Sequence, residues 1–179
     1  MHLKKQSVDV LVAADKLIKL DRRDLDSLKE KVSKTPKKRI RINIHASPKD
    51  SIHEMFIVNR QDTYIRPHKH LYKKESYHVI EGRAINVLFD DKGTIRTVIP
   101  LGDFSSGFDF YYKLNEPQFH CLVIQSEYFV FVEVTNGPFR KTDNVFAPWS
   151  PDEKDSLAVK SYLYKLKNDI KVWLKNNHE

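Results

Sequence analysis

The middle of this 179-residue chain is a succession of short alternating segments, which limits the fold more than any other feature. Residues 39–45 read Arg-Ile-Arg-Ile-Asn-Ile-His, and such alternation of polar and apolar side chains is typical of a half-buried β-strand. Further short segments follow at nearly regular spacing, separated by turn signals. Eight or nine short strands predict a closed barrel or a double-sheet jelly roll. The eight that follow the first are residues 52–59, 63–66, 77–81, 84–90, 95–100, 108–114, 119–125 and 128–135.

Two helices are expected to flank this β region, so that the predicted segments are residues 1–38, 39–149 and 150–179. In the first segment, a strand gives way to a helix capped by Asp21 or Asp24. In the last segment, Ser150, Pro151 and Glu153 match a capping box with proline at the first helical position. The apolar stripe of that helix predicts docking on the barrel or on the same helix of a second copy. The stripe consists of Val159, Tyr162, Leu163, Leu166, Ile170, Trp173 and Leu174.

The formal net charge of +7 is confined to the N-terminal quarter of the chain. Residues 1–41 hold 13 lysines and arginines against six acidic residues, and the remainder is balanced. Aromatic residues do not interleave with these bases, so a stacking platform for single-stranded nucleic acid is absent and we expect no nucleic-acid partner. The longest apolar run, residues 128–132, is too short to cross a bilayer. We expect a cytoplasmic protein without a membrane partner.

The segment from Tyr64 to Gly82 carries the most informative chemistry. His68 and His70 are two residues apart, so in an extended chain both imidazoles leave the same face. Four residues separate His70 from Glu75, which is enough for a turn that returns a carboxylate from the neighbouring strand. Two imidazoles and a carboxylate from adjacent strands are typical of a divalent transition-metal site. His120, at the start of an apolar strand, is the best candidate for a fourth ligand.

The spacing of these residues resembles the first motif of the cupin superfamily, in which His-x-His is followed by glutamate and then glycine. Residues Pro117 to His120 resemble the core of the second motif. The resemblance implies a cupin-type double-stranded β-helix, a mainly β jelly-roll barrel, with an N-terminal helical segment and a C-terminal amphipathic helix. It also implies one divalent transition metal held by His68, His70, Glu75 and His120. The donor set suits iron, manganese, nickel, cobalt or zinc.

Within the cupins, residues 24–148 resemble the WbuC family of cupin-fold metalloproteins. The resemblance rests on the Arg41-x-Asn-x-His45 stretch, on Arg66-Pro-His-x-His70, on Glu75 and Gly82, and on residues 133–139. Members of that family are often encoded among genes for O-antigen and other surface-polysaccharide sugars. The resemblance therefore implies surface-polysaccharide sugar biosynthesis, with a sugar nucleotide or a similar polar small molecule as the ligand.

Alternation along the strands predicts the residues that bind this sugar-like ligand. Tyr64 and Arg66 lie at even spacing from the two histidines, so along a strand they share the same face. Tyr77 is related to Glu75 in the same way. A second group lies on one face of an earlier strand. It consists of Arg41, Asn43 and His45. Such a pocket beside a metal suits an anionic or polyhydroxyl molecule, although ordinary surface ion pairs explain the same residues equally well.

Two functions of different classes remain open at this point, and the catalytic residues are unassigned. One is a metal-dependent enzyme, of isomerase, epimerase or oxygenase type. The other is a non-catalytic sugar-binding or regulatory protein whose metal is structural or absent. Because cupin barrels commonly pair through their sheets, we also expect a homodimer. His2, His53 and His178 have no partners at useful spacing and are expected on the surface, and His78 is expected to point away from Glu75.

Overall fold

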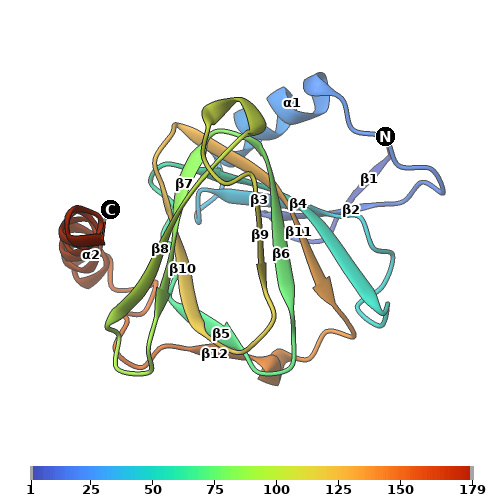
Figure 1. The fold of residues 1–179 in the computed structure, drawn as a ribbon. Coiled ribbons are helices and arrows are strands. Elements are labelled where there is room, and N and C mark those ends of the chain that lie inside the picture. The colour runs from blue at the N-terminus through green and yellow to red at the C-terminus, as the bar shows by residue number, and fades with distance from the viewer. Residues whose placement is uncertain (1, 178–179) are drawn as a thin grey trace.

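The computed structural model describes residues 2–177, which form two facing β-sheets with one helix outside each sheet (Figure 1). Sheet A has the strand order β1-β2-β3-β4-β11-β6-β9, and sheet B has the order β12-β5-β10-β7-β8. Only β2 and β3 pair in parallel among the paired strands of residues 2–177. The strands of sheet A are β1 (Leu3–Lys5), β2 (Val10–Ala13), β3 (Arg39–Asn43), β4 (Ile52–Arg60), β6 (Glu75–Glu81), β9 (Tyr111–Leu114) and β11 (Tyr128–Asn136). Those of sheet B are β5 (His68–His70), β7 (Arg83–Phe89), β8 (Ile95–Gly102), β10 (Phe119–Ile124) and β12 (Asn144–Phe146).

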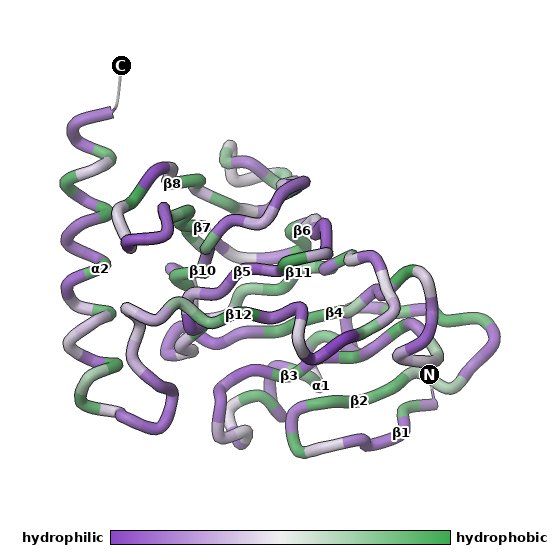
Figure 2. The backbone as a smooth tube through the Cα atoms, turned by 90° about the horizontal axis from the view of Figure 1, so that it is seen from below, coloured by the Kyte–Doolittle hydropathy of each residue, from purple (hydrophilic) through white to green (hydrophobic). Residues whose placement is uncertain are grey.

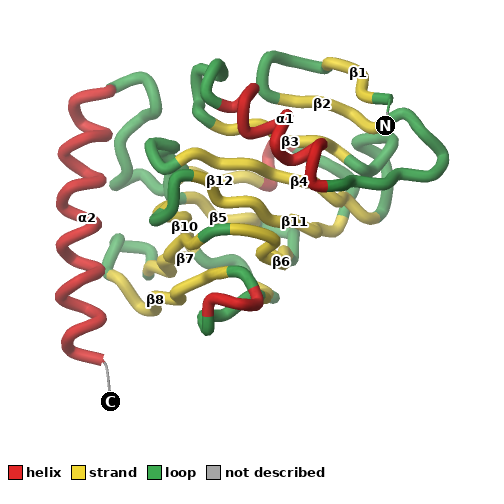
Figure 3. Tube along the Cα trace, turned by 90° about the horizontal axis from the view of Figure 1, so that it is seen from above, coloured by secondary structure: helices red, strands yellow, loops and turns green. Residues whose placement is uncertain are grey.

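Side-chain alternation divides the hydrophobic residues into three layers. The barrel interior is filled from both sheets by residues such as Phe129, Phe131 and Leu122. The outer face of sheet A packs on helix α1 (Arg22–Val32) through Leu28 and Val32. The outer face of sheet B packs on helix α2 (Ser156–Asn177). The two helices therefore lie on different sides of the barrel, as the view from above shows (Figure 3).

This architecture confirms the predicted fold class, which is mainly β and of cupin-type jelly-roll form with a helix before and after the barrel. The predicted strand at residues 63–66 is wrong, because this stretch is irregular and the next strand, β5, is a short one that begins at His68. Short 3-10 turns connect two pairs of strands. They span Phe104–Ser106 and Lys141–Asp143.

The cap of α1 is as predicted, whereas that of α2 is not. The Asp21 carboxylate accepts the backbone N–H groups of Arg23 and Asp24, which completes a capping box. Helix α2 begins at Ser156, and its first turn is capped by Asp155, whose Oδ1 accepts the Ala158 N–H at 3.0 Å. Ser150 does not cap the helix because its hydroxyl donates to the Ala147 carbonyl at 2.8 Å.

Helix α2 docks on its own barrel through most of the predicted stripe, although Val159 and Leu163 are not part of the cluster against sheet B. Leu166 and Ile170 are buried against sheet B, and Trp173 packs at the edge of the same cluster. Figure 2 shows that hydrophobic residues recur between hydrophilic ones along α2. Trp149, just before the helix, joins this layer and packs on Phe89 with ring centroids 5.0 Å apart. Within residues 2–177, no helix combines the length and the apolar character needed to cross a membrane.

Candidate metal centre

The three predicted histidine ligands converge inside the barrel, on the inner face of sheet B. His68 of β5 is directly opposite His120 of β10, with ring centroids 4.6 Å apart. The His70 ring lies 5.0 Å from that of His68 and 5.7 Å from that of His120. One ring nitrogen from each residue lies within 4.8 Å of the other two. This separation is suitable for three nitrogens that bind one metal ion.

Glu75 completes the cluster from the opposing sheet. The four residues between β5 and β6 reverse the chain, so that the first residue of β6 faces the imidazoles. Its Oε2 lies 3.1 Å from Nε2 of His70, and its Oε1 lies 2.8 Å from Nε2 of His120. The Glu75 side chain is only 1% exposed. The structure thus places all four predicted ligands in one buried group.

Backbone contacts orient two of the rings. Nδ1 of His68 lies 2.9 Å from the Arg66 carbonyl, and Nδ1 of His120 lies 2.9 Å from the Gln118 carbonyl. A carbonyl oxygen can only accept, so we assign the proton of each neutral ring to Nδ1. Nε2 of each ring then presents a lone pair to the centre, as a metal ligand must.

The residues fit a divalent metal because their buried atoms have no other partner. Within residues 2–177, both carboxylate oxygens of Glu75, Nε2 of His120 and Nδ1 of His70 lack a hydrogen bond. Buried polar atoms are nearly always paired. A carboxylate oxygen and an imidazole lone pair 2.8 Å apart repel each other unless a proton or a metal ion lies between them. Three nitrogens and one carboxylate form a typical donor set for a divalent transition metal.

The charges at the centre are strongly coupled. Burial raises the pKa of Glu75, but the imidazoles of His120 and His70 outweigh this effect and hold the pKa well below its ordinary value. Burial lowers the pKa of His120, but the Glu75 carboxylate outweighs it and the net direction is upward. For His68, burial and the two neighbouring imidazoles lower the pKa to about 3. Without a metal, the attraction between the Glu75 carboxylate and the His120 imidazole therefore favours the charged forms of both groups, whereas burial disfavours a proton on His68.

Acid is expected to destabilise the metal-free protein through His68. Its pKa in the folded state, about 3, is below the ordinary value of 6.5. At a pH between these two values, the imidazole binds a proton in the unfolded chain but not in the folded protein. This contribution to stability is complete above pH 6.5 and declines as the pH falls toward 3. From pH 7 to pH 5 it amounts to about 2 kcal/mol.

Urea unfolding in a chelator at both pH values measures this decline. His68→Gln should reduce the loss by about 2 kcal/mol. The exposed His78 provides a control, and His78→Gln should keep the parent dependence. An unchanged pH dependence in His68→Gln would contradict the expectation.

The binding residues predicted on the first of the barrel strands lie on β3 or just after it, and they lie beside this centre. Arg41, Asn43 and His45 line a cavity of about 250 Å³ at the mouth of the barrel, and His70 lines the same cavity. The register of sheet A explains this position, because Thr135 of β11, which also lines the cavity, is directly opposite Glu75. The cavity therefore adjoins the metal centre.

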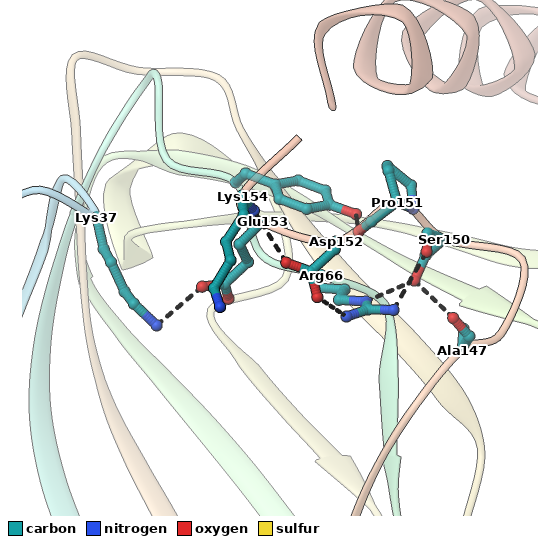
Figure 4. A network of polar contacts seen from close by, with 9 residues as sticks. Lys37, Arg66, Ala147, Ser150, Pro151, Asp152, Glu153 and Lys154 are labelled. Carbon is teal, nitrogen blue, oxygen red and sulfur yellow. Dashed lines mark hydrogen bonds and ion pairs between the residues drawn. The ribbon is translucent and has the colours of Figure 1, made fainter. Parts of the chain in front are cut away.

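The other predicted binding residues do not reach this cavity. The Tyr64 hydroxyl donates to the Pro151 carbonyl at 3.1 Å. The Arg66 guanidinium pairs with Asp152 at 2.9 Å and donates to Ser150, so it fastens the segment before α2 (Figure 4). The expectation that Tyr64 and Arg66 share a face with the histidines is wrong, because residues 63–67 are not a strand. Tyr77 lies in the interior core, 4% exposed, with its ring against Phe131.

Several cavity residues were not assigned from the sequence. Glu133 follows Phe129 and Phe131 at strand spacing, and the burial of these phenylalanines in the interior places it on the inner face. The prediction that His53 is on the surface is wrong: it is 3% exposed and stacks on His45 with ring centroids 4.2 Å apart. His2 and His78 are exposed as expected, and His178 lies outside the described residues.

Comparisons with known proteins give a partial match. Residues 20–101 match the model of a domain of unknown function, DUF6016, which covers less than half of the chain and includes His68, His70 and Glu75 but not His120. No curated protein matches. The resemblance to the WbuC family stays a prediction.

Solved structures with similar folds were also found. A protein from Shewanella oneidensis has 14% identity and a TM-score of 0.49 over 59% of this chain and 72% of its own. An uncharacterised Klebsiella pneumoniae protein with a double-stranded β-helix domain has 19% identity and a TM-score of 0.45, over 61% and 79%. The formate complex of Lactobacillus farciminis oxalate decarboxylase has 14% identity and a TM-score of 0.43, over 54% and 27%. About half of this chain thus aligns with about a quarter of the decarboxylase chain.

The topology and the ligand cluster of this chain define its class. It is a cupin-type jelly-roll protein with three histidines placed at metal-binding distance inside the barrel.

Proposed function

We propose that the protein binds one divalent transition metal through His68, His70, Glu75 and His120 and uses this centre to bind a polar small molecule. The observation that supports this most directly is the convergence of three ring nitrogens within 4.8 Å beside a buried, unpaired carboxylate. The resemblance to the WbuC family extends the proposal to a sugar-like ligand from surface-polysaccharide metabolism. In this proposal the molecule acts in the cytoplasm as a homodimer.

The residues around the centre have different roles in this proposal. When bound, the metal supplies a Lewis acid that polarises a carbonyl or hydroxyl oxygen, which suits isomerisation, epimerisation or oxidation. Glu75 provides the negative charge that balances the cation. The Arg66 and Gln118 carbonyls hold the rings of His68 and His120 in the tautomer that binds metal. The polar side chains of the adjoining cavity orient the ligand.

Metal content is the direct test. Protein purified without added metal and then loaded should hold about one divalent ion per chain, measured by elemental analysis after dialysis. His68→Ala and His120→Ala should each lower metal affinity by about 100-fold or more, because each removes a ligand from a set of four.

His78→Ala is the matched control for the metal measurement. His78 lies on β6, the strand that carries Glu75, but its side chain is exposed on the outer face. The variant should retain as much metal as the parent. Equal metal content in His68→Ala, His120→Ala and the parent would overturn the proposed site.

A further inference from the structure

The cavity beside the metal centre is small. Its volume is about 250 Å³, and it is partly open to solvent. A three- or four-carbon acid or sugar fragment suits a space of this size beside His70, whereas most of a nucleotide sugar would lie outside it.

Besides Nδ1 of His70, four polar atoms of the cavity wall lack hydrogen bonds within residues 2–177. They are Nε of Arg41, Oδ1 of Asn43, Nε2 of His53 and Oγ1 of Thr135. Two of these side chains are more than nine-tenths buried, since His53 is 3% exposed and Thr135 is 4% exposed. Such atoms cost free energy unless something pairs with them. Their common position around one cavity indicates a polar ligand.

The chemistry of these atoms specifies the ligand further. The Arg41 guanidinium is a donor that suits the two oxygens of a carboxylate. Oδ1 of Asn43 only accepts, so it requires a donor such as a hydroxyl group on the same ligand. The Thr135 hydroxyl can donate or accept. One carboxylate and at least one hydroxyl satisfy the set.

The charges around the cavity favour an anionic ligand. Arg41 and Lys73 are the two cations of the wall, and Glu133 is its one anion. A divalent metal held beside Glu75 would add further positive charge. Because Arg41 is the one guanidinium of the wall, the cavity offers a single planar fork and therefore suits one carboxylate group.

We infer that this cavity binds a small hydroxylated monocarboxylic acid, with the carboxylate on Arg41 and a hydroxyl on Asn43. This inference rests on the proposed function, since it names the ligand class of the same centre. The acid then lies next to His70, where one of its oxygens has access to the metal site.

Calorimetry with D-glycerate tests the inference. The metal-loaded protein should bind glycerate more tightly than glycerol, inorganic phosphate or UDP-glucose, which test the roles of the carboxylate, the charge and the size. Arg41→Gln should weaken glycerate binding by roughly 10- to 100-fold, because it removes a charge-assisted hydrogen bond. Arg41→Lys keeps the charge but loses the planar guanidinium group. Its affinity for glycerate should therefore lie between that of the parent and that of Arg41→Gln.

Arg96→Gln is the control, because Arg96 is exposed on β8 and pairs with Asp90 far from the cavity wall. It should bind glycerate as the parent does. Thermal unfolding of every variant verifies folding, and if Arg41→Gln fails to fold, Arg41→Lys must still bind more weakly than the parent. Parent-like binding by a folded Arg41 variant would overturn the inference, as would tighter binding of phosphate or UDP-glucose.

Metal analysis of the same samples separates this inference from the proposed function. If the protein holds one metal but does not bind glycerate at millimolar concentration, the ligand class is wrong and the metal centre stands. If the protein holds no metal but binds glycerate in a manner that depends on Arg41, the cavity assignment stands and the metal centre is wrong.

Discussion

Addition of a divalent transition metal to the metal-free protein is expected to raise the free energy of unfolding by about 4 kcal/mol when free metal exceeds its dissociation constant about 1,000-fold. The reason is that the four ligands meet only in the folded barrel, because they come from three strands in two sheets. Urea unfolding with metal and with chelator measures the difference.

Glu75→Gln should lose most of this metal-dependent gain in stability. The amide keeps the shape of the side chain but lacks the negative charge that balances the cation. Glu81→Gln is the matched control, because Glu81 ends the same strand and pairs with Lys29 at 2.6 Å on the other side of the sheet. It should show the full gain of the parent. An equal gain in Glu75→Gln would remove the carboxylate from the ligand set.

Phe129→Ala is expected to lower the free energy of unfolding by about 3–5 kcal/mol. Phe129 has no exposed surface and packs in the interior cluster, with its ring centroid 5.2 Å from that of Phe131. Its removal leaves a cavity between two sheets whose other side chains are held by the strand register, so the space cannot readily collapse.

Phe104→Ala provides the comparison for the core variant. Phe104 is 82% exposed, in a 3-10 turn, and its loss should change the free energy by no more than about 0.5 kcal/mol. Chemical unfolding of the two variants under the same conditions measures both values. A loss below about 1 kcal/mol for Phe129→Ala would show that this part of the interior is not tightly packed.

The fold and the ligand cluster were predictable because both rest on local spacing. Alternation identifies strands wherever one face is buried and the other is polar. His68 and His70 lie on one strand, and only four residues separate them from Glu75, so the distances within this part of the cluster depend on a single turn. His120 was a candidate from its position at the start of an apolar strand, and the resemblance of residues 117–120 to a known motif strengthened this assignment.

The positions of the other site residues could not be predicted from local spacing in the sequence. The direction in which Arg66 points depends on whether its segment is a strand, and Pro67 belongs to an irregular stretch that rotates the chain before β5. Glu133 lies on the inner face with Phe129 and Phe131, but the alternation along β11 does not by itself show which face of the sheet is the interior. Ser150 matched a capping box by sequence, but its hydroxyl is used in a tertiary contact.

The location of the two tryptophans decides what optical spectroscopy can report. Trp149 and Trp173 both pack in the layer between sheet B and α2, and the barrel interior holds neither. Intrinsic tryptophan fluorescence therefore follows the release of the C-terminal helix, whereas the β-sheet amide I band in the infrared follows the strands. Coincident transitions by the two signals would show that helix and barrel unfold as one cooperative unit.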